Sequence, residues 1–305
     1  MSVQALIVDP EAPDAMRIAE VAEPTIGPTE ALIEVHHISL NRGDLNDARS
    51  GRIPPGGVLG SDAAGVVTEA SRDRSGLGVG ARVVALAPGA FAERIAVEVD
   101  SVAEVPESVD LSEAAALPVA GLAALRALRA AGPLLGRRVL ITGASGGVGR
   151  FAVQLAARAG AHVIASVGSV ARAQGLAERG ADEVVVGLDG LEQPVHVVLD
   201  NVGGPQLVAA WRLLAPGGSL QSIGWTSGEP AVFPPYSTIG PPKSISSFLN
   251  QGDAAEELST LVGLVADRSL SVGIGWRGPW KQFAEAAEML RGRRVNGKAV
   301  LDVRA

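Results

Sequence analysis

Residues 143–149, Gly-Ala-Ser-Gly-Gly-Val-Gly, are the part of the chain whose composition and spacing point most directly to chemistry. Glycines accept positive φ and let the backbone approach a ligand closely. The apolar run before them predicts a strand, and the apolar periodicity after them predicts a helix capped at Gly160. The N-terminus of such a helix binds pyrophosphate through its N–H groups. The residues expected to bind a dinucleotide cofactor here are Gly143, Ser145, Gly146, Gly147, Val148 and Gly149.

The same run also contains Gly143-x-Ser145-x-Gly147, the pattern of a nucleophile elbow. A serine hydrolase with Ser145 as its nucleophile is therefore an alternative. Such an enzyme needs an acid and a histidine downstream, and the last histidine of the chain, His196, lies within a predicted strand rather than on a loop. This context favours the dinucleotide.

The residues that follow the second predicted strand, 162–167, indicate which dinucleotide binds. Folds that bind NAD place an acid there, about 20 residues beyond the glycines, where it binds the ribose 2′-hydroxyl. Residues 163–174 contain no acid, but they contain Ser166, Ser169 and Arg172. The missing acid carries most of the inference, because Arg172 taken alone is as well read as an ordinary solvated helix residue. Two hydroxyls and a guanidinium together suit a 2′-phosphate. We therefore expect NADP(H) as the cofactor.

Two later strand ends supply further candidate cofactor residues. Asn201 and Val202 follow the predicted strand at 195–199, Ile223 ends the predicted strand at 219–223, and Gly224 follows it. Ligands of a doubly wound sheet lie beyond the carboxyl ends of its strands. We expect these four residues to contact the cofactor, with Gly224 near the nicotinamide.

Strand-like runs alternate with helical patterns from residue 137 to residue 223, which predicts a parallel sheet covered on both faces. The predicted helices include one at 171–179. The first hundred residues are β-rich, with no strong helix before about Leu111. The terminal run at 298–303 predicts a strand that joins this N-terminal region. The expected fold class is α/β, with a β-rich domain interrupted by a doubly wound domain.

Composition excludes several function classes. The net charge of −7 over 305 residues argues against nucleic-acid or anionic membrane partners. The chain has no cysteine, which removes disulfides, thiol nucleophiles and cysteine-ligated zinc. No secretory signal is recognisable, and charged residues and prolines interrupt the Ala/Leu-rich stretch at 111–135. We expect a cytoplasmic location.

Further motifs occur along the chain at 39–44, 60–67, 79–83, 115–121, 200–204 and 297–300. In this order, together with the 143–149 run, they resemble the medium-chain dehydrogenase/reductase superfamily, in its zinc-independent quinone oxidoreductase-like branch. The resemblance covers nearly the whole chain. It implies a GroES-like domain formed by 1–117 and 261–305, an inserted Rossmann domain at 118–260, a cofactor in the cleft between them, and a homodimer.

The chain departs from the zinc-dependent members of the family that it resembles at two positions. Asn41 stands where those relatives carry a metal-binding cysteine, and Ser61 stands in place of a ligand histidine. We therefore expect no metal site. Without a Lewis acid to polarise an alcohol, the resemblance implies hydride transfer from NADPH to an electron-poor small molecule, a quinone or an α,β-unsaturated carbonyl compound.

Three polar residues are the candidate catalytic residues: Asn41, Asp44 and Asn46. Each also suits helix capping or a turn, and Asn46 replaces a tyrosine that quinone oxidoreductases often show. Phe248 and Leu249 are candidates for the apolar wall of the substrate pocket, or for core packing. The alternative from another class is a non-catalytic NADPH-binding redox sensor or structural protein, which would bind NADPH without turnover.

Overall fold

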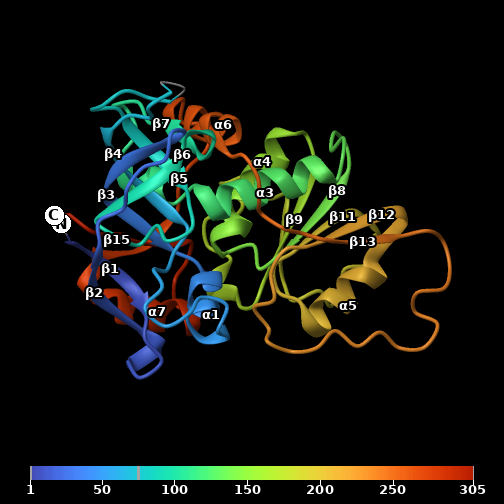
Figure 1. The fold of residues 1–305 in the computed structure, drawn as a ribbon. Helices are drawn as coiled ribbons and strands as arrows, with labels where there is room; N and C mark the ends of the chain where they lie inside the picture. The colour runs from blue at the N-terminus through green and yellow to red at the C-terminus, as the bar shows by residue number, and fades with distance from the viewer. Residues whose placement is uncertain (1, 74–75, 305) are drawn as a thin grey trace. The chain divides into compact units, whose positions relative to one another are not determined.

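The computed structural model describes residues 2–73 and 76–304, which divide into two compact units. Unit 1 comprises residues 1–122 and 251–305, and unit 2, residues 123–250, is inserted into it (Figure 1). The division falls within helix α3 (Pro118–Ala130). The sequence predicts an inserted domain at 118–260, which extends beyond unit 2 at both ends. In the described residues no helix has the length and apolar character to cross a bilayer.

Unit 1 is built on a largely antiparallel sheet in the order β14-β15-β3-β4-β5-β7, with β6 paired to β3. Its strands are β3 (Glu30–Leu40), β4 (Asp62–Glu69), β5 (Arg82–Leu86), β6 (Arg94–Glu98), β7 (Val102–Glu104), β14 (Ile274–Pro279) and β15 (Lys298–Asp302). A two-stranded ribbon is formed by β1 (Ser2–Val8) and β2 (Met16–Ala22). Its helices include α1 (Arg42–Ser50), α2 (Leu111–Ala115), α6 (Ala255–Ala266) and α7 (Phe283–Arg291), with 3-10 turns η1 (Pro13–Ala15), η2 (Val99–Ser101) and η4 (Trp280–Gln282).

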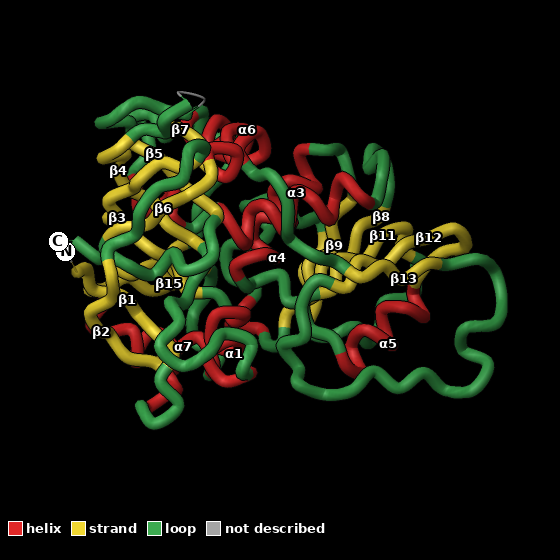
Figure 2. The backbone as a smooth tube through the Cα atoms, in the orientation of Figure 1, coloured by secondary structure: helices red, strands yellow, loops and turns green. Residues whose placement is uncertain are grey.

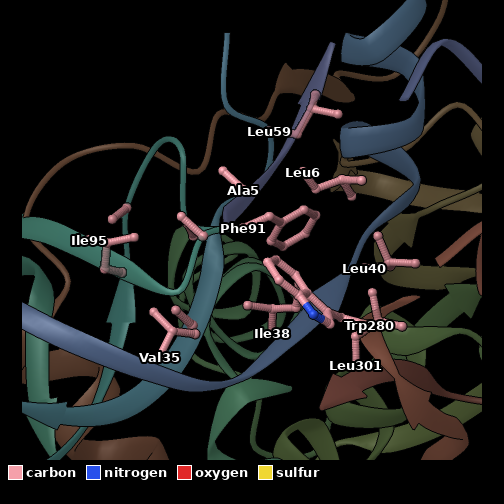
Figure 3. Close-up of a cluster of buried hydrophobic side chains, with 14 of the residues drawn as sticks. Ala5, Leu6, Val35, Ile38, Leu40, Leu59, Phe91, Ile95, Trp280 and Leu301 are labelled. Carbon is pink, nitrogen blue, oxygen red and sulfur yellow. The ribbon is translucent and has the colours of Figure 1, made fainter. Parts of the chain in front are cut away.

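The terminal strand joins the N-terminal sheet, as the sequence predicts. Strand β15 pairs antiparallel with β3, with Ala299 opposite Leu40. The core of unit 1 forms where this sheet meets the ribbon, and side chains distant in sequence pack together there, including Leu6, Phe91 and Trp280 (Figure 3). This packing closes the discontinuous unit.

The expectation of no strong helix before about Leu111 is wrong, because α1 forms at Arg42–Ser50. Asn41 and Asp44 make a capping box at its start, and Gly51, with φ +73°, ends it. Only Asp44, Leu45 and Ala48 are buried in it. The capping residues at its two ends are what indicate this helix in the sequence, because it has too few apolar residues to show helical periodicity.

Unit 2 contains a six-stranded sheet in the order β10-β9-β8-β11-β12-β13, and every pairing in it is parallel. Figure 2 shows strands β8, β9, β11, β12 and β13 of this sheet in yellow. The strands are β8 (Arg138–Thr142), β9 (His162–Val167), β10 (Glu183–Val186), β11 (Val195–Asp200), β12 (Leu214–Ser222) and β13 (Ser244–Ser247). Helix α4 (Gly147–Arg158) connects β8 to β9, and α5 (Gly204–Leu213) connects β11 to β12. The chain proceeds outward in opposite directions from β8 and from β11, so the order reverses between these two strands. In such sheets ligands bind at this switch point.

The predicted helix at 171–179 does not form. The segment contains only the 3-10 turn η3 (Val170–Arg172), followed by turns. Gly175 has φ +75°, which no α-helix accommodates, and its carbonyl accepts a hydrogen bond from Arg179 Nη1 at 2.6 Å. The apolar residues of this segment have helical spacing, but the turn at Gly175 prevents a helix from forming.

Candidate functional site

The carboxyl ends of four neighbouring strands of unit 2 meet at one edge of its sheet. The register pairs Thr142 on β8 with Ser166 on β9, and Asp200 on β11 with Ser222 on β12. The predicted cofactor residues of the sequence lie on these ends or in the segments directly after them: Gly143, Ser145, Gly146, Gly147, Val148 and Gly149 after β8; Ser166, Ser169 and Arg172 at and after the end of β9; Asn201 and Val202 after β11; Ile223 and Gly224 after β12. The fold thus brings together residues up to 81 positions apart (143 to 224).

The glycine run forms a tight turn into α4. Gly143 has φ +61°, and Gly146 N donates to Gly143 O at 3.0 Å. A Cβ at Gly149 would lie 2.5 Å from Ala144 Cα and from Gly143 O, so only glycine lets the helix pack this closely on the turn. The first helical hydrogen bond at this end is Arg150 N to Gly146 O. The N–H groups of the preceding first turn therefore point outward without intrahelical partners, which suits a pyrophosphate.

Ser145 joins this turn to the segment that follows β9. Its hydroxyl accepts a hydrogen bond from Arg172 Nε at 2.8 Å, and its carbonyl accepts one from Arg150 Nε at 3.2 Å. Ser145 is only 2% exposed. Two of the residues predicted to bind the cofactor, Ser145 and Arg172, are therefore in direct contact.

The serines at the end of β9 and after it differ in their surroundings. Ser166 is fully buried; its hydroxyl donates to Gly187 O at 2.8 Å and accepts from Gln206 Nε2 at 3.1 Å. Ser169 is exposed and immediately precedes η3. The polar atoms of Ser169 are therefore accessible, whereas Ser166 holds neighbouring elements together.

A buried carboxylate ties β8 to β11 at the switch point. Thr142 Oγ1 donates to Asp200 Oδ1 at 2.6 Å, and Gly203 N donates to Asp200 Oδ2 at 2.8 Å. Burial raises the pKa of Asp200, while these hydrogen bonds act in the opposite direction. Asn201 Nδ2 in turn donates to Thr142 O at 2.9 Å. This network fixes Asn201 beside Gly143, where an added Cβ would lie 3.4 Å from Asn201 Cβ.

The last predicted residues of unit 2 follow its edge strand. Phe248 is partly exposed, and Leu249 is 71% exposed. Neither belongs to the hydrophobic cluster around Leu140 and Trp211 in unit 2. The exposure of Leu249 does not fit core packing, and a role for both residues in binding substrate stays a proposal.

A second polar cluster lies in unit 1, where the ends of three adjacent strands meet. Asn41 follows β3, Asp62 begins β4 and Lys298 begins β15. Lys298 Nζ donates to Asn41 Oδ1 at 2.5 Å and lies 3.1 Å from Asp62 Oδ2. Asn41 Nδ2 donates to Asp62 Oδ2 at 2.9 Å. The side chains of Lys298 and Asp62 are 3% and 0% exposed, so this is a buried ion pair bridged by an amide.

Two candidate catalytic residues are engaged by this cluster. Asp44 Oδ2 accepts from Asn41 N at 2.7 Å, and the two residues form the capping box of α1. The amide of Asn41 is held by Asp62 on one side and Lys298 on the other. The third candidate, Asn46, is exposed on α1. The sequence offered helix capping as an alternative role for these residues. The described contacts of Asn41 and Asp44 show this capping role.

Burial raises the pKa of Asp44 to about 7, and the nearby negative charge of Asp62 adds to this effect. The folded state holds the proton of such an acid more tightly than the unfolded state does. The fold is therefore most stable when the acid is protonated and least stable when it is ionised. The free energy of unfolding should therefore fall as the pH rises from 3.8, and the loss should be complete above about pH 7.

Asp44→Asn should remove this pH dependence while retaining a side-chain oxygen at the helix cap. Between pH 5 and pH 8, the unfolding free energy of the wild type should fall by about 3 kcal/mol more than that of the variant. Urea denaturation at a series of pH values measures this. Parallel curves for the two proteins would show that Asp44 does not titrate in this range.

The residues at the positions of the zinc ligands do not fit that metal. Asn41 Oδ1 faces the Lys298 ammonium, which would repel a cation, and Ser61 offers a hydroxyl in place of an imidazole. Within residues 2–73 and 76–304, no three His, Cys, Asp or Glu side chains are grouped to hold a metal ion. The side chains at these two positions therefore do not fit zinc.

Ser145 lacks the surroundings of a nucleophile. Of the two histidines in unit 2, His162 begins β9 and His196 lies near the start of β11, at the sheet edge opposite to Ser145. The ring of His196 accepts a hydrogen bond from Arg138 N at 3.0 Å. The geometry therefore offers Ser145 no histidine base within its unit.

The sequence interpretation missed five residues of these networks. They are Asp62, Thr142, Arg150, Asp200 and Lys298. The signal that could have identified them is a charged or hydroxyl residue at the end of an apolar strand, or, for Arg150, a cation directly after the last glycine of the turn. A polar or charged side chain is buried only when it has a hydrogen-bond or ion-pair partner. Each of these residues therefore implies such a partner, which only the three-dimensional structure identifies.

Two family models match the chain. One, the alcohol dehydrogenase GroES-like domain, covers residues 27–107, and the other, the zinc-binding dehydrogenase, covers residues 147–267. Acryloyl-coenzyme A reductase from Sulfurisphaera tokodaii is 30% identical over 254 residues, covering 72% of this chain and 76% of that protein. The mycocerosic acid synthase-like polyketide synthase from Mycolicibacterium smegmatis is 29% identical over 317 residues, 95% of this chain. The chain spans only 15% of that synthase.

Solved structures resemble the fold over its whole length. The quinone oxidoreductase from Coxiella burnetii superposes with a TM-score of 0.88 at 28% identity, with 100% of both chains covered. A mycobacterial protein complexed with NADPH superposes with a TM-score of 0.86 at 26% identity, covering 98% of this chain and 99% of that one. These similarities extend across both units.

Proposed function

Because this chain belongs to the medium-chain dehydrogenase/reductase superfamily and is quinone oxidoreductase-like, we propose that it is an NADPH-dependent, metal-independent oxidoreductase. Its proposed acceptors are quinones and α,β-unsaturated carbonyl compounds. The observation that carries the proposal is the glycine turn at the switch point of the parallel sheet, with Arg172 bound to Ser145 beside it. The names of two similar proteins, a quinone oxidoreductase and an acryloyl-coenzyme A reductase, support this acceptor class.

The turn is suited to hold the coenzyme in a fixed position. The N–H groups of Gly147, Val148 and Gly149 would bind the pyrophosphate, and the dipole of α4 favours its negative charge. Asn201 and Gly224 would flank the nicotinamide half, since a Cβ at Gly224 would lie 3.0 Å from Asn201 O. Reduced nicotinamide supplies a hydride when bound, and the protein orients it and excludes water.

The donor set in unit 1 supports the proposed acceptor class. A quinone or an activated alkene is already electron-poor, so it needs no metal to polarise it. We propose Asn46, exposed on α1, together with the partly exposed Asn41, as polar contacts for the acceptor. Asp44 is a positioning residue, because its carboxylate fixes the backbone of Asn41. Phe248 and Leu249 are the proposed apolar contacts.

The test is NADPH oxidation, followed by absorbance, with a panel that includes 1,4-benzoquinone, a 2-alkenal and an enoyl thioester. Turnover with a member of this panel, unchanged by a chelator, is the expected result. Tight NADPH binding without turnover of any acceptor would instead favour the non-catalytic NADPH-binding alternative. Labelling of Ser145 by a fluorophosphonate would favour the hydrolase.

Arg172→Ala tests the proposed preference for NADPH. A charge-assisted contact to phosphate contributes about 1.5–3 kcal/mol, so we expect the variant to lose about 10- to 100-fold in NADPH affinity. NADH affinity should change little, because NADH lacks the 2′-phosphate. Titration of both coenzymes by calorimetry measures this, and an equal loss for both would remove Arg172 from the 2′-phosphate site.

A further inference from the structure

Two arginines contact Ser145 in unit 2, and a third, Arg179, lies close enough to Arg150 for their like charges to interact. Besides the bonds of Arg172 and Arg150 to Ser145, Arg150 Nη2 donates to Gln174 O at 3.4 Å. Arg150 is only 7% exposed, although it lies in the first turn of a helix. The third arginine, Arg179, is partly exposed and donates to Gly175 O. Helix α4, the glycine turn and the segment after β9 thus converge on one positively charged cluster.

The cluster is electrostatically unfavourable as it stands. Burial lowers the pKa of Arg150, and the positive charges of Arg179 and Arg172 lower it further. Arg150 and Arg179 form no ion pair with a carboxylate in the described part of the chain, and Arg179 Nε is buried there without a hydrogen-bond partner. Like charges held together in a site of low dielectric constant are stabilised by an anion that binds among them.

The position of the cluster selects the anion. Arg172 and Gln174 follow the carboxyl end of β9, the strand next to the one that leads into the glycine turn. In this fold the ribose of the adenosine half lies at the end of that strand. The pyrophosphate has its own donors in the first turn of α4, so the arginines are left for a second phosphate group. A phosphate monoester carries up to two negative charges at neutral pH.

We propose that Arg150, Arg172 and Arg179 form a dianion site for a 2′-phosphorylated adenosine, and that Arg150 is a specificity-determining residue of the coenzyme site. The inference rests on the proposed NADPH dependence and deepens it. Arg150 acts from within the helix, where its Nε bond to Ser145 O holds the turn against the cluster. Arg172 alone would then give only part of the discrimination against NADH.

The experiment compares adenosine 2′,5′-bisphosphate with adenosine 5′-monophosphate by calorimetry on the full chain. The variants are Arg150→Gln and Arg179→Gln. Arg158→Gln is the matched control, because it removes the same charge from the exposed last turn of the same helix. We expect the wild type and the control to prefer the bisphosphate by at least about 30-fold. Arg150→Gln should lower this preference about tenfold, and Arg179→Gln should lower it by a smaller factor.

An unchanged preference in Arg150→Gln would overturn the proposal, as would an equal loss in Arg158→Gln. Thermal unfolding of each variant checks its folding. If Arg150→Gln does not fold, Arg179→Gln decides, and an unchanged preference there overturns the dianion site. A wild type that oxidises NADH as well as NADPH would sink this inference but leave the oxidoreductase intact. A wild type that binds neither coenzyme would sink both.

Discussion

Lys298→Met is expected to lower the free energy of unfolding by about 3–5 kcal/mol, because it leaves a buried carboxylate without its counter-charge. Lys298 and Asp62 are almost completely buried, and their charged atoms are 3.1 Å apart. Removal of the ammonium also takes away the positive charge that lowers the pKa of the nearby Asp44 carboxyl, while the negative charge of Asp62, which raises that pKa, remains. Guanidinium denaturation at pH 7 measures the loss.

Two comparisons isolate the ion pair from the loss of packing. The double variant Asp62→Asn/Lys298→Met removes both charges, so it should lose less stability than the sum of the two single variants. Arg17→Met breaks the exposed pair between Arg17 and Asp9, whose side chains are 53% and 25% exposed. That control should cost less than about 1 kcal/mol. If Lys298→Met costs no more than Arg17→Met, the buried cluster does not hold unit 1 together as described.

Gly149→Ala is expected to reduce NADPH affinity by about 100-fold. The added Cβ would lie 2.5 Å from two backbone atoms of the turn, Ala144 Cα and Gly143 O. Neither atom can rotate away, so α4 and the turn must separate by several tenths of an ångström or more. A displacement approaching 1 Å in a positioning element costs about 100-fold in function. Fluorescence or calorimetric titration with NADPH measures the change.

Graded controls are available in the same chain. A Cβ at Gly146 would meet only Gly143 O, at 3.3 Å, so Gly146→Ala should weaken NADPH binding far less. Gly263 lies inside α6 with nothing within 4 Å, so Gly263→Ala should leave binding unchanged and raise stability by about 1 kcal/mol. NADPH affinity within threefold of the wild type in a folded Gly149→Ala protein would contradict the role given to the turn.

The parallel unit could be predicted from its sequence because its signals are local. A buried strand, a glycine turn and an amphipathic helix each show within a dozen residues, and their alternation defines the sheet. The place of the terminal strand in the N-terminal sheet followed from the lack of a crossover helix after it. Hydrophobic periodicity does not predict the helix at 42–50, because capping residues form it, and wrongly predicts one at 171–179, because the turn at Gly175 prevents it.

The polar networks could not be predicted, because their partners are distant in sequence. Lys298 and Asn41 are brought together only by the pairing of β15 with β3. The proposed role of Arg150 depends on the nearby charges of Arg172 and Arg179. The sequence predicts a helix for the segment that contains these two residues, and the structure has only a 3-10 turn followed by turns there. Asn41 was a candidate catalytic residue by its position in a motif, and only the structure shows how its amide is held.

A crystal structure of the protein grown with NADPH would address the coenzyme site most directly. We predict pyrophosphate oxygens on the N–H groups of Gly147, Val148 and Gly149, and the 2′-phosphate within hydrogen-bond distance of Arg172. Coenzyme bound elsewhere on the molecule, or a turn without diphosphate at saturating NADPH, would contradict this prediction.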